Sequence, residues 1–201
     1  MARDGWFAAV WDWQAHHEGK RLKLLRREVA GDVHGRVLEV GVGVGSNWPY
    51  LPGDVEYVGI EPNEAMLERA LKHAREQGRS MDLRLIDVQA MPFPDASFDA
   101  VVATLTFCSV PDAGTGLREI RRVLQPGGEF RFLEHVRARR SAWARVQSFL
   151  KPATRRLGGG CEWDRDTLAA IRAAGLEVSK PRRDRLALLP IVAGSATKPA
   201  P

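Results

Sequence analysis

The sequence predicts an α/β fold in which helices cover a doubly wound, mostly parallel sheet. The first observation is the run from Val37 to Asn47, in which a short apolar strand is followed by glycines at 41, 43 and 45. The second is that apolar strand-like runs are separated by amphipathic helical stretches. The third is Glu61, a carboxylate at the end of the next strand and 22 residues after Glu39.

The glycine-rich turn is the centre of the predicted site. Glycine permits a sharp backbone turn, and it lets a ligand approach closely because it has no Cβ. Ser46 and Asn47 follow where a helix would begin and direct N–H groups at a ligand. The alternative is a strand-to-helix turn that binds nothing. Glu61 can accept hydrogen bonds from two ribose hydroxyls, which indicates an adenosine cofactor, either NAD or S-adenosylmethionine.

The N-terminal segment is predicted to be helical. Phe7, Val10 and Trp11 fall at i, i+3 and i+4, which suits an amphipathic helix over residues 4–15. A basic helix over 20–30 follows, with Leu22, Leu25 and Val29 inward. The first helix has three interpretations: a lid over a pocket, simple packing on the sheet, or an anchor at a membrane surface.

The middle of the chain alternates strands and helices. After a strand over 56–60, Asn63 can cap a helix over 64–77 that ends at Gly78. Strands are expected over 83–86 and 98–103, the latter apolar on both faces like a central parallel strand. A helix over 112–124 ends at the run Gln125-Pro126-Gly127-Gly128, which leads into a strand over 129–134.

A basic segment dominates the C-terminal part. Residues 137–156 contain seven Lys or Arg and no carboxylate, with apolar residues at helical spacing, namely Trp143, Val146, Phe149 and Leu150. This pattern indicates a solvated helix face, a site for an anionic acceptor, or contact with a phospholipid surface. A helix over 164–174 and strands over 176–179 and 186–194 follow, and the tail from Ser195 is expected to be disordered.

Several motifs together resemble the class I S-adenosylmethionine-dependent methyltransferases. Over residues 35–135 they are Glu39 to Gly45, Glu61, Asp87-Val88, Ser97 to Val102 and Leu124 to Gly128. A narrower likeness covers most of the chain, through Val40 to Gly43 with Asn47 and Pro49, Gly59 to Pro62, Phe107 to Val110, Phe132 to His135 and Gly158 to Cys161. These motifs resemble the methyltransferase-like thiol methyltransferases, bacterial phosphatidylethanolamine N-methyltransferases and ubiquinone/menaquinone methyltransferases. Val44 departs from the family, where threonine or serine is commoner.

The resemblance implies a single-domain, Rossmann-like sheet of seven strands with N-terminal helices as a lid. The expected organisation is a helical lid over 1–34, a methyltransferase domain over 35–195 and a tail over 196–201.

Position in the motifs assigns cofactor contacts. Gly41, Gly43 and Gly45 would let the backbone approach the methionine and ribose parts, and Glu39 would hold the methionine ammonium, directly or through water. Ser46 or Asn47 would contact the methionine carboxylate. Glu61, with Pro62, would hold the ribose.

The resemblance assigns the rest of the cofactor site. It implies that Asp87 accepts a hydrogen bond from the adenine amino group and that the Val88 N–H contacts the adenine ring. It also implies that Thr104 and Leu105 make backbone contacts to the methionine end. The alternative for Asp87 is a turn cap.

Acceptor residues are less sharply indicated. His135 ends the fifth strand and could act as general base or be structural. Cys161 could lie near the acceptor or be an inert buried thiol. Trp6 on the lid, and Trp48, Tyr50 and Phe107, could form an apolar pocket wall or ordinary core. Methyl transfer mainly requires alignment of the reacting atoms and exclusion of water. Because no Cys/His cluster has zinc spacing, we expect no metal.

Composition favours one globular domain. The chain has 201 residues, a net charge of +5 and two cysteines, which are too few for a disulfide framework. With no membrane-spanning run and no signal peptide recognised, we expect a cytoplasmic protein, monomeric or homodimeric, at most peripheral to an anionic membrane.

The leading functional hypothesis is methyl transfer from S-adenosylmethionine, leaving S-adenosylhomocysteine, to a small-molecule acceptor. The acceptor would be a thiol, amine or hydroxyl of a metabolite, lipid or natural product. The alternatives are a nucleic-acid methyltransferase, a non-catalytic cofactor-binding partner protein and an NAD dehydrogenase. Nucleic acid is disfavoured because Thr104 to Phe107 lacks the Asn/Asp-Pro-Pro-aromatic run of amino-methylating enzymes.

Overall fold

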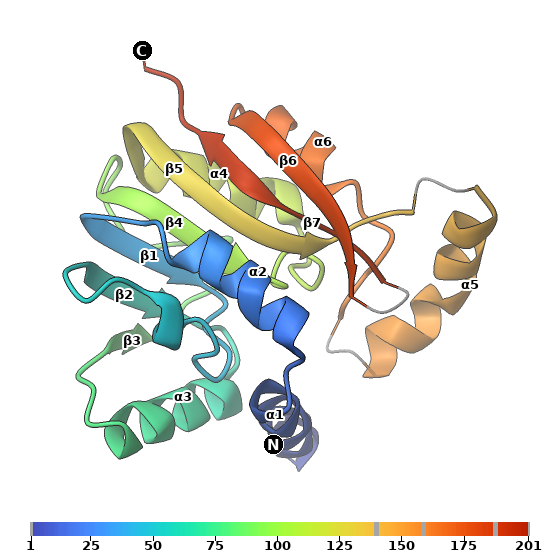
Figure 1. Cartoon of the computed structure of the whole chain (residues 1–201), viewed down its shortest axis with the longest axis horizontal. Helices are drawn as coiled ribbons and strands as arrows, with labels where there is room; N and C mark the ends of the chain where they lie inside the picture. The colour runs from blue at the N-terminus through green and yellow to red at the C-terminus, as the bar shows by residue number, and fades with distance from the viewer. Residues whose placement is uncertain (1, 139–140, 158–159, 187–188, 201) are drawn as a thin grey trace.

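A computed structural model describes residues 2–138, 141–157, 160–186 and 189–200 (Figure 1). Its centre is a seven-stranded sheet in the order β3-β2-β1-β4-β5-β7-β6. The first five strands pair in parallel, whereas β7 runs antiparallel to both β5 and β6. The predicted α/β fold is therefore confirmed, including the seven strands and the reversal of strand order after β3.

The elements follow the predicted order, with shifted ends. The strands are β1 (Arg36–Val40), β2 (Glu56–Ile60), β3 (Asp82–Arg84), β4 (Phe98–Thr104), β5 (Leu124–His135), β6 (Glu177–Leu186) and β7 (Leu189–Thr197). The helices are α1 (Ala2–His16), α2 (Lys20–Ala30), α3 (Glu64–Glu76), α4 (Ala113–Val123), α5 (Ser141–Leu157) and α6 (Thr167–Ala173), with a 3-10 turn η1 (Trp48–Tyr50). None of the described helices has the length and apolar character needed to cross a membrane.

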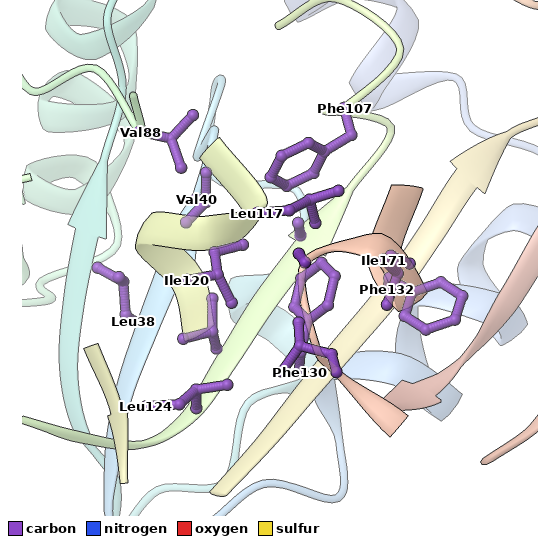
Figure 2. Close-up of a cluster of buried hydrophobic side chains, with 14 of the residues drawn as sticks. Leu38, Val40, Val88, Phe107, Leu117, Ile120, Leu124, Phe130, Phe132 and Ile171 are labelled. Carbon is purple, nitrogen blue, oxygen red and sulfur yellow. The ribbon is translucent and has the colours of Figure 1, made fainter. Parts of the chain in front are cut away.

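Helices cover both faces of the sheet. On one face α2 packs Leu25 and Val29 against strand residues that include Val102 and Leu133. On the other face α4 and α6 bury a larger cluster around two phenylalanines of β5 (Figure 2). Its labelled members are Leu38, Val40, Val88, Phe107, Leu117, Ile120, Leu124, Phe130, Phe132 and Ile171. Both faces of the sheet are thus packed with apolar side chains.

The connection between β1 and β2 differs from the prediction. A helix was expected to begin at Ser46-Asn47, but only the short turn η1 forms there. Leu51 has an extended backbone (φ −64°, ψ 139°) because it precedes Pro52, and proline disfavours a helical residue before it. The glycine turn that precedes η1 is held by its own backbone donors: the Gly41 N–H donates to the Ile60 carbonyl at 2.9 Å, and the Gly45 N–H donates to the Val42 carbonyl at 3.0 Å.

The first helix packs on α3 rather than on the sheet. Ala8 is buried with Val44 and Met66, and Trp11 packs beside them. The predicted inward position of Val10 is wrong, because its side chain is 40% exposed. Arg69 on α3 donates a hydrogen bond of 2.9 Å to the Asp12 carboxylate, which holds the two helices together. The side chain of Phe7 lies outside the described residues.

The expected disordered tail is instead part of the sheet. Residues Ser195 to Thr197 belong to β7 and pair with Glu129 to Arg131 of β5. Beyond the strand, the Lys198 N–H donates to the Gly128 carbonyl at 3.0 Å. The small and polar residues of this segment suggested a disordered tail. However, β7 lies between two strands, and backbone pairing with both stabilises it without large side chains.

Candidate functional site

A cavity of about 880 Å³ opens at the carboxyl ends of the parallel strands. The last residues of four strands line it, namely Val40, Ile60, Thr104 and His135. Helices α1 and α2 close another side with residues that include Trp6, Trp11 and Arg26. The cavity sits where the strand order reverses beside β1, which is the usual ligand position in such sheets.

The three glycines of the turn play different structural roles. All have positive φ: +70° at Gly41, +60° at Gly43 and +89° at Gly45. A Cβ at Gly41 would lie 2.5 Å from Thr106 Oγ1, and one at Gly45 would lie 2.5 Å from the ring of Trp48. A Cβ at Gly43 would meet only Met66 Cε, at 3.6 Å. Gly41 and Gly45 are thus fixed by packing, whereas Gly43 leaves open space at the cavity wall.

Glu61 lines the cavity and is held in place by backbone donors. The N–H groups of Gly43 and Asn63 each donate to its carboxylate at 3.0 Å. Burial raises the pKa of Glu61 above its ordinary value, and these two donors oppose that shift. Asp87, Val88 and Pro62 line the same part of the cavity, and Gln89 donates to both Asp87 oxygens at 2.9 Å.

Glu39 supports the cavity wall from behind. Its carboxylate accepts hydrogen bonds from Tyr57 Oη at 2.6 Å and from Asn47 Nδ2 at 2.8 Å. Burial raises the pKa of Glu39 to about 7, against the lowering effect of these two donors. Glu39, Gly45 and Asn47 are not among the described residues that line the cavity, although Gly41, Gly43, Thr104 and Leu105 are.

Arg26 joins this network to the N-terminal helices and was missed as a site residue. Its Nη1 donates to Asn47 Oδ1 at 3.0 Å and to Thr104 Oγ1 at 2.6 Å. Its Nη2 donates to Glu18 at 2.7 Å, in an ion pair whose two side chains are each 8% exposed. The signal was present in the sequence, because Arg26 lies on the inward helical stripe between Leu25 and Val29.

Glu134 shapes the loop after β4 and was also missed. Its fully buried carboxylate accepts from the backbone N–H groups of Thr106 and Phe107 at 2.9 Å and of Cys108 at 3.3 Å. Burial raises the pKa of Glu134 to about 7, and the three donors lower it. Leu105, just before this loop, has an unusual positive φ of 57°. An acidic residue near the end of an apolar strand, as at Glu39, was the available signal.

One part of the cavity wall carries two thiols and an imidazole. His135, Cys161 and Cys108 all line it and are all buried. Cys161 Sγ lies 3.8 Å from His135 Nδ1. Trp6 also lines the cavity, but Trp48 and Phe107 lie in apolar clusters and are not among the described lining residues. The cavity therefore has a polar, carboxylate-bearing half and a half lined by thiols and apolar groups.

Comparison with known proteins bears on this arrangement. The methyltransferase domain family matches residues 38–132. The chain is 34% identical over 181 residues to a thiol S-methyltransferase of Homo sapiens, covering 87% of this chain and 73% of that protein. It is 35% identical over 145 residues to a phosphatidylethanolamine N-methyltransferase of Cereibacter sphaeroides, covering 70% and 71%. The solved YcgJ protein of Bacillus subtilis shares the fold, with a TM-score of 0.73, 17% identity, and 90% and 98% coverage.

Proposed function

Because this chain belongs to the class I S-adenosylmethionine-dependent methyltransferases, we propose that it methylates the sulfur of a small apolar thiol. The observation that carries the proposal is the buried wall of Cys108, His135 and Cys161 on the acceptor side of the cavity. The relative named as a thiol S-methyltransferase, which aligns over most of both chains, supports it.

The other half of the cavity fits the cofactor. Gly43 has no Cβ to fill the space beside the wall, and Glu61 presents a carboxylate fixed by two backbone donors. We assign the ribose hydroxyls to Glu61, the adenine amino group to Asp87 and the adenine ring to the Val88 N–H. Leu105 and Thr104 would face the methionine end. The bound cofactor supplies an electrophilic methyl carbon, and the chain aligns the acceptor with it and excludes water.

The charges in the cavity favour a neutral acceptor. Among the described lining residues the carboxylates are Glu18, Glu61 and Asp87, and each already has hydrogen-bond donors. Glu61 and Asp87 are assigned to the cofactor and Glu18 pairs with Arg26, so an ammonium acceptor would find no further carboxylate among them. A thiol is a stronger acid than the matching alcohol, with a pKa of about 8.5 in the cysteine side chain, so a base can help it to lose its proton near neutral pH. His135 lies on the acceptor wall, where an imidazole can accept that proton.

A lipid amine is the second candidate. One relative is named as a phosphatidylethanolamine N-methyltransferase. Trp6 and Trp13 on α1 and Phe149 on α5 are strongly exposed, the last at 83%. Figure 1 shows α5 standing away from the sheet. Exposed aromatic side chains, together with Arg145 four residues before Phe149 on α5, suit peripheral contact with an anionic membrane surface, from which a lipid headgroup could enter past Trp6.

A binding and turnover experiment separates these functions. The protein is first titrated with S-adenosylmethionine by calorimetry and then assayed for S-adenosylhomocysteine release. The acceptors are a short alkyl thiol, the matching alkyl amine, and vesicles containing phosphatidylethanolamine. We expect kcat/KM for the thiol to exceed that for either amine at least ten-fold. Turnover on the vesicles alone would select the lipid amine, and binding without turnover on any acceptor would indicate a non-catalytic cofactor-binding protein.

Glu61 gives a prediction about pH. The Glu61→Gln variant should bind S-adenosylmethionine more weakly by about 1.5–3 kcal/mol at pH 8, because an amide replaces a charged acceptor of the ribose hydroxyls. Since the pKa of Glu61 in the free protein is raised above 4.5, the carboxylate begins to protonate above that pH. Wild-type affinity should therefore be highest well above this raised pKa and fall as the pH decreases through it.

Calorimetry from pH 8 to pH 5 tests this prediction. In Glu61→Gln the affinity for S-adenosylmethionine should no longer fall as the pH decreases. Glu76→Gln, at an exposed position at the end of α3, should behave as wild type. Equal pH dependence in wild type and Glu61→Gln would remove Glu61 from the ribose site.

A further inference from the structure

Three metal-ligating side chains meet in the acceptor wall from distant parts of the sequence. Cys108 lies in the loop after β4, His135 ends β5, and Cys161 lies between α5 and α6. One ligand atom from each lies within 4.8 Å of the other two. All three residues are buried and line the cavity. Because neighbouring members lie 26 or 27 positions apart in the sequence, the cluster has no short zinc-spaced motif.

We propose that Cys108, His135 and Cys161 bind a zinc ion, or a similarly thiophilic divalent metal, with a fourth position open to the acceptor. Zinc–sulfur bonds of about 2.3 Å and zinc–nitrogen bonds of about 2.0–2.1 Å place tetrahedral ligands roughly 3.5–3.8 Å apart. Cys161 Sγ and His135 Nδ1 are already 3.8 Å apart. Two sulfurs, one imidazole and an open position form a known type of catalytic zinc site.

The backbone around the cluster is held by contacts that do not use the ligand atoms. The Glu162 N–H donates to the Cys108 carbonyl at 2.7 Å, which ties the two cysteine segments together. Thr167 Oγ1 donates to the His135 carbonyl at 3.3 Å. Glu134 fixes the loop that carries Cys108 through its N–H groups. The three ligands are therefore presented by segments already fixed to one another, as a binding site requires.

A second group of candidate ligands is much less suited to a metal. Asp12, His16 and His73 also bring their ligand atoms within 4.8 Å of one another. His16 is exposed, however, and Arg69 donates to the Asp12 carboxylate at 2.9 Å. A guanidinium there competes with a cation, whereas the described surroundings of the cysteine cluster include no such paired arginine on its ligand atoms. The cluster in the cavity is the better site.

The open position gives the metal a role in the proposed thiol methylation, on which this part of the inference rests. An acceptor thiol that binds there releases its proton to solvent and stays as a thiolate. Its sulfur lone pair then forms the bond to the methyl carbon, while the bond from methyl to the sulfonium breaks and its electron pair remains on S-adenosylhomocysteine. With the metal bound, His135 is a ligand and no longer the proton acceptor considered above, because a coordinated nitrogen has no free lone pair.

Cobalt binding tests the site without cofactor or acceptor. Reduced protein is stripped with a chelator and titrated with Co²⁺ alone. We expect one equivalent to give thiolate-to-cobalt charge-transfer bands and the intense visible bands of tetrahedral cobalt, both abolished by Zn²⁺. Cys108→Ser and Cys161→Ser should each weaken Co²⁺ binding at least ten-fold and reduce the charge-transfer intensity. His34→Ala, at an exposed histidine, is the matched control and should bind as wild type.

Further measurements keep the outcomes separate. The affinity of the serine variants for S-adenosylmethionine reports whether they are folded. Gly43→Val should keep the cobalt spectrum but lose S-adenosylmethionine binding. Less than a tenth of an equivalent of bound metal in reduced protein with both thiols titratable would overturn the site. An unchanged spectrum in Cys161→Ser would do the same. Methylation of a thiol by metal-free protein would refute the role of the metal in the reaction but leave the proposed function. Bound metal without thiol turnover would refute the proposed function but leave the metal site.

Discussion

Replacing Gly43 with valine is expected to lower the affinity for S-adenosylmethionine at least 100-fold, or about 2.7 kcal/mol, while the chain stays folded. At φ +60° a β-branched residue is strained, so the turn must shift or place two methyl groups beside the cavity. The shift would also move the N–H that donates to Glu61 at 3.0 Å. The fold tolerates the change because an added Cβ meets only Met66 Cε, at 3.6 Å.

Gly78→Val is the matched control for backbone strain. Gly78 follows α3, has a φ of +63° and has no heavy atom within 4 Å of an added Cβ. It should lose a similar amount of thermal stability and keep wild-type affinity in calorimetry. If Gly43→Val binds the cofactor as tightly as Gly78→Val does, the glycine turn is not the cofactor site.

Replacing Arg26 with methionine should reduce the free energy of unfolding by about 3–5 kcal/mol, which is the usual cost of leaving a buried charge without its partner. The change removes the partner of Glu18, whose side chain is 8% exposed, and the donors to Asn47 and Thr104. Because Thr104 lines the cavity, the affinity for S-adenosylmethionine should fall as well. Urea unfolding and calorimetry measure the two effects.

Two variants isolate the cause. Adding Glu18→Gln to Arg26→Met removes the unpaired charge and should restore part of the lost stability. Arg21→Met is the control on the same helix: Arg21 pairs with Asp184 at the surface, its side chain is 65% exposed, and its loss should cost at most about 1 kcal/mol. Equal losses for Arg21→Met and Arg26→Met would show that the buried network contributes nothing beyond a surface ion pair.

The sequence predicted features that depend on near neighbours. The glycine turn and the helix capped by Asn63 follow from local composition and spacing, and Asn63 does accept from the Met66 N–H at 3.0 Å. The order of the strands in the sheet was implied by the family resemblance. The helix expected after Asn47 does not form, for a reason present in the local sequence: Pro52 disfavours a helical conformation at Leu51. The prediction of a disordered tail from Ser195 was wrong because β7 is stabilised by pairing on both sides, which composition does not reveal.

Distant contacts explain what the sequence could not indicate. The bond from Arg26 to Thr104 spans 78 residues, and the approach of Cys161 to His135 spans 26. Neither pair has a fixed spacing that marks it as a site. Trp48 and Phe107 looked like pocket walls because they are aromatic and near the motifs, yet both side chains are buried in core clusters. Proximity in sequence predicted the cavity-lining residues near the glycine turn better than it predicted the aromatic lining.

The position of β7 imposes an order on the pairing of strands during translation. β7 is the last of the described strands along the chain, but it lies between β5 and β6, which leave the ribosome before it. β6 borders no other described strand, so it has no sheet partner until residues 189–197 emerge. The pairing of Glu129 with Thr197 also joins residues far apart in the chain, which makes it slow to form. His135, on the strand that β7 completes, can reach its final environment only after translation of this segment has ended.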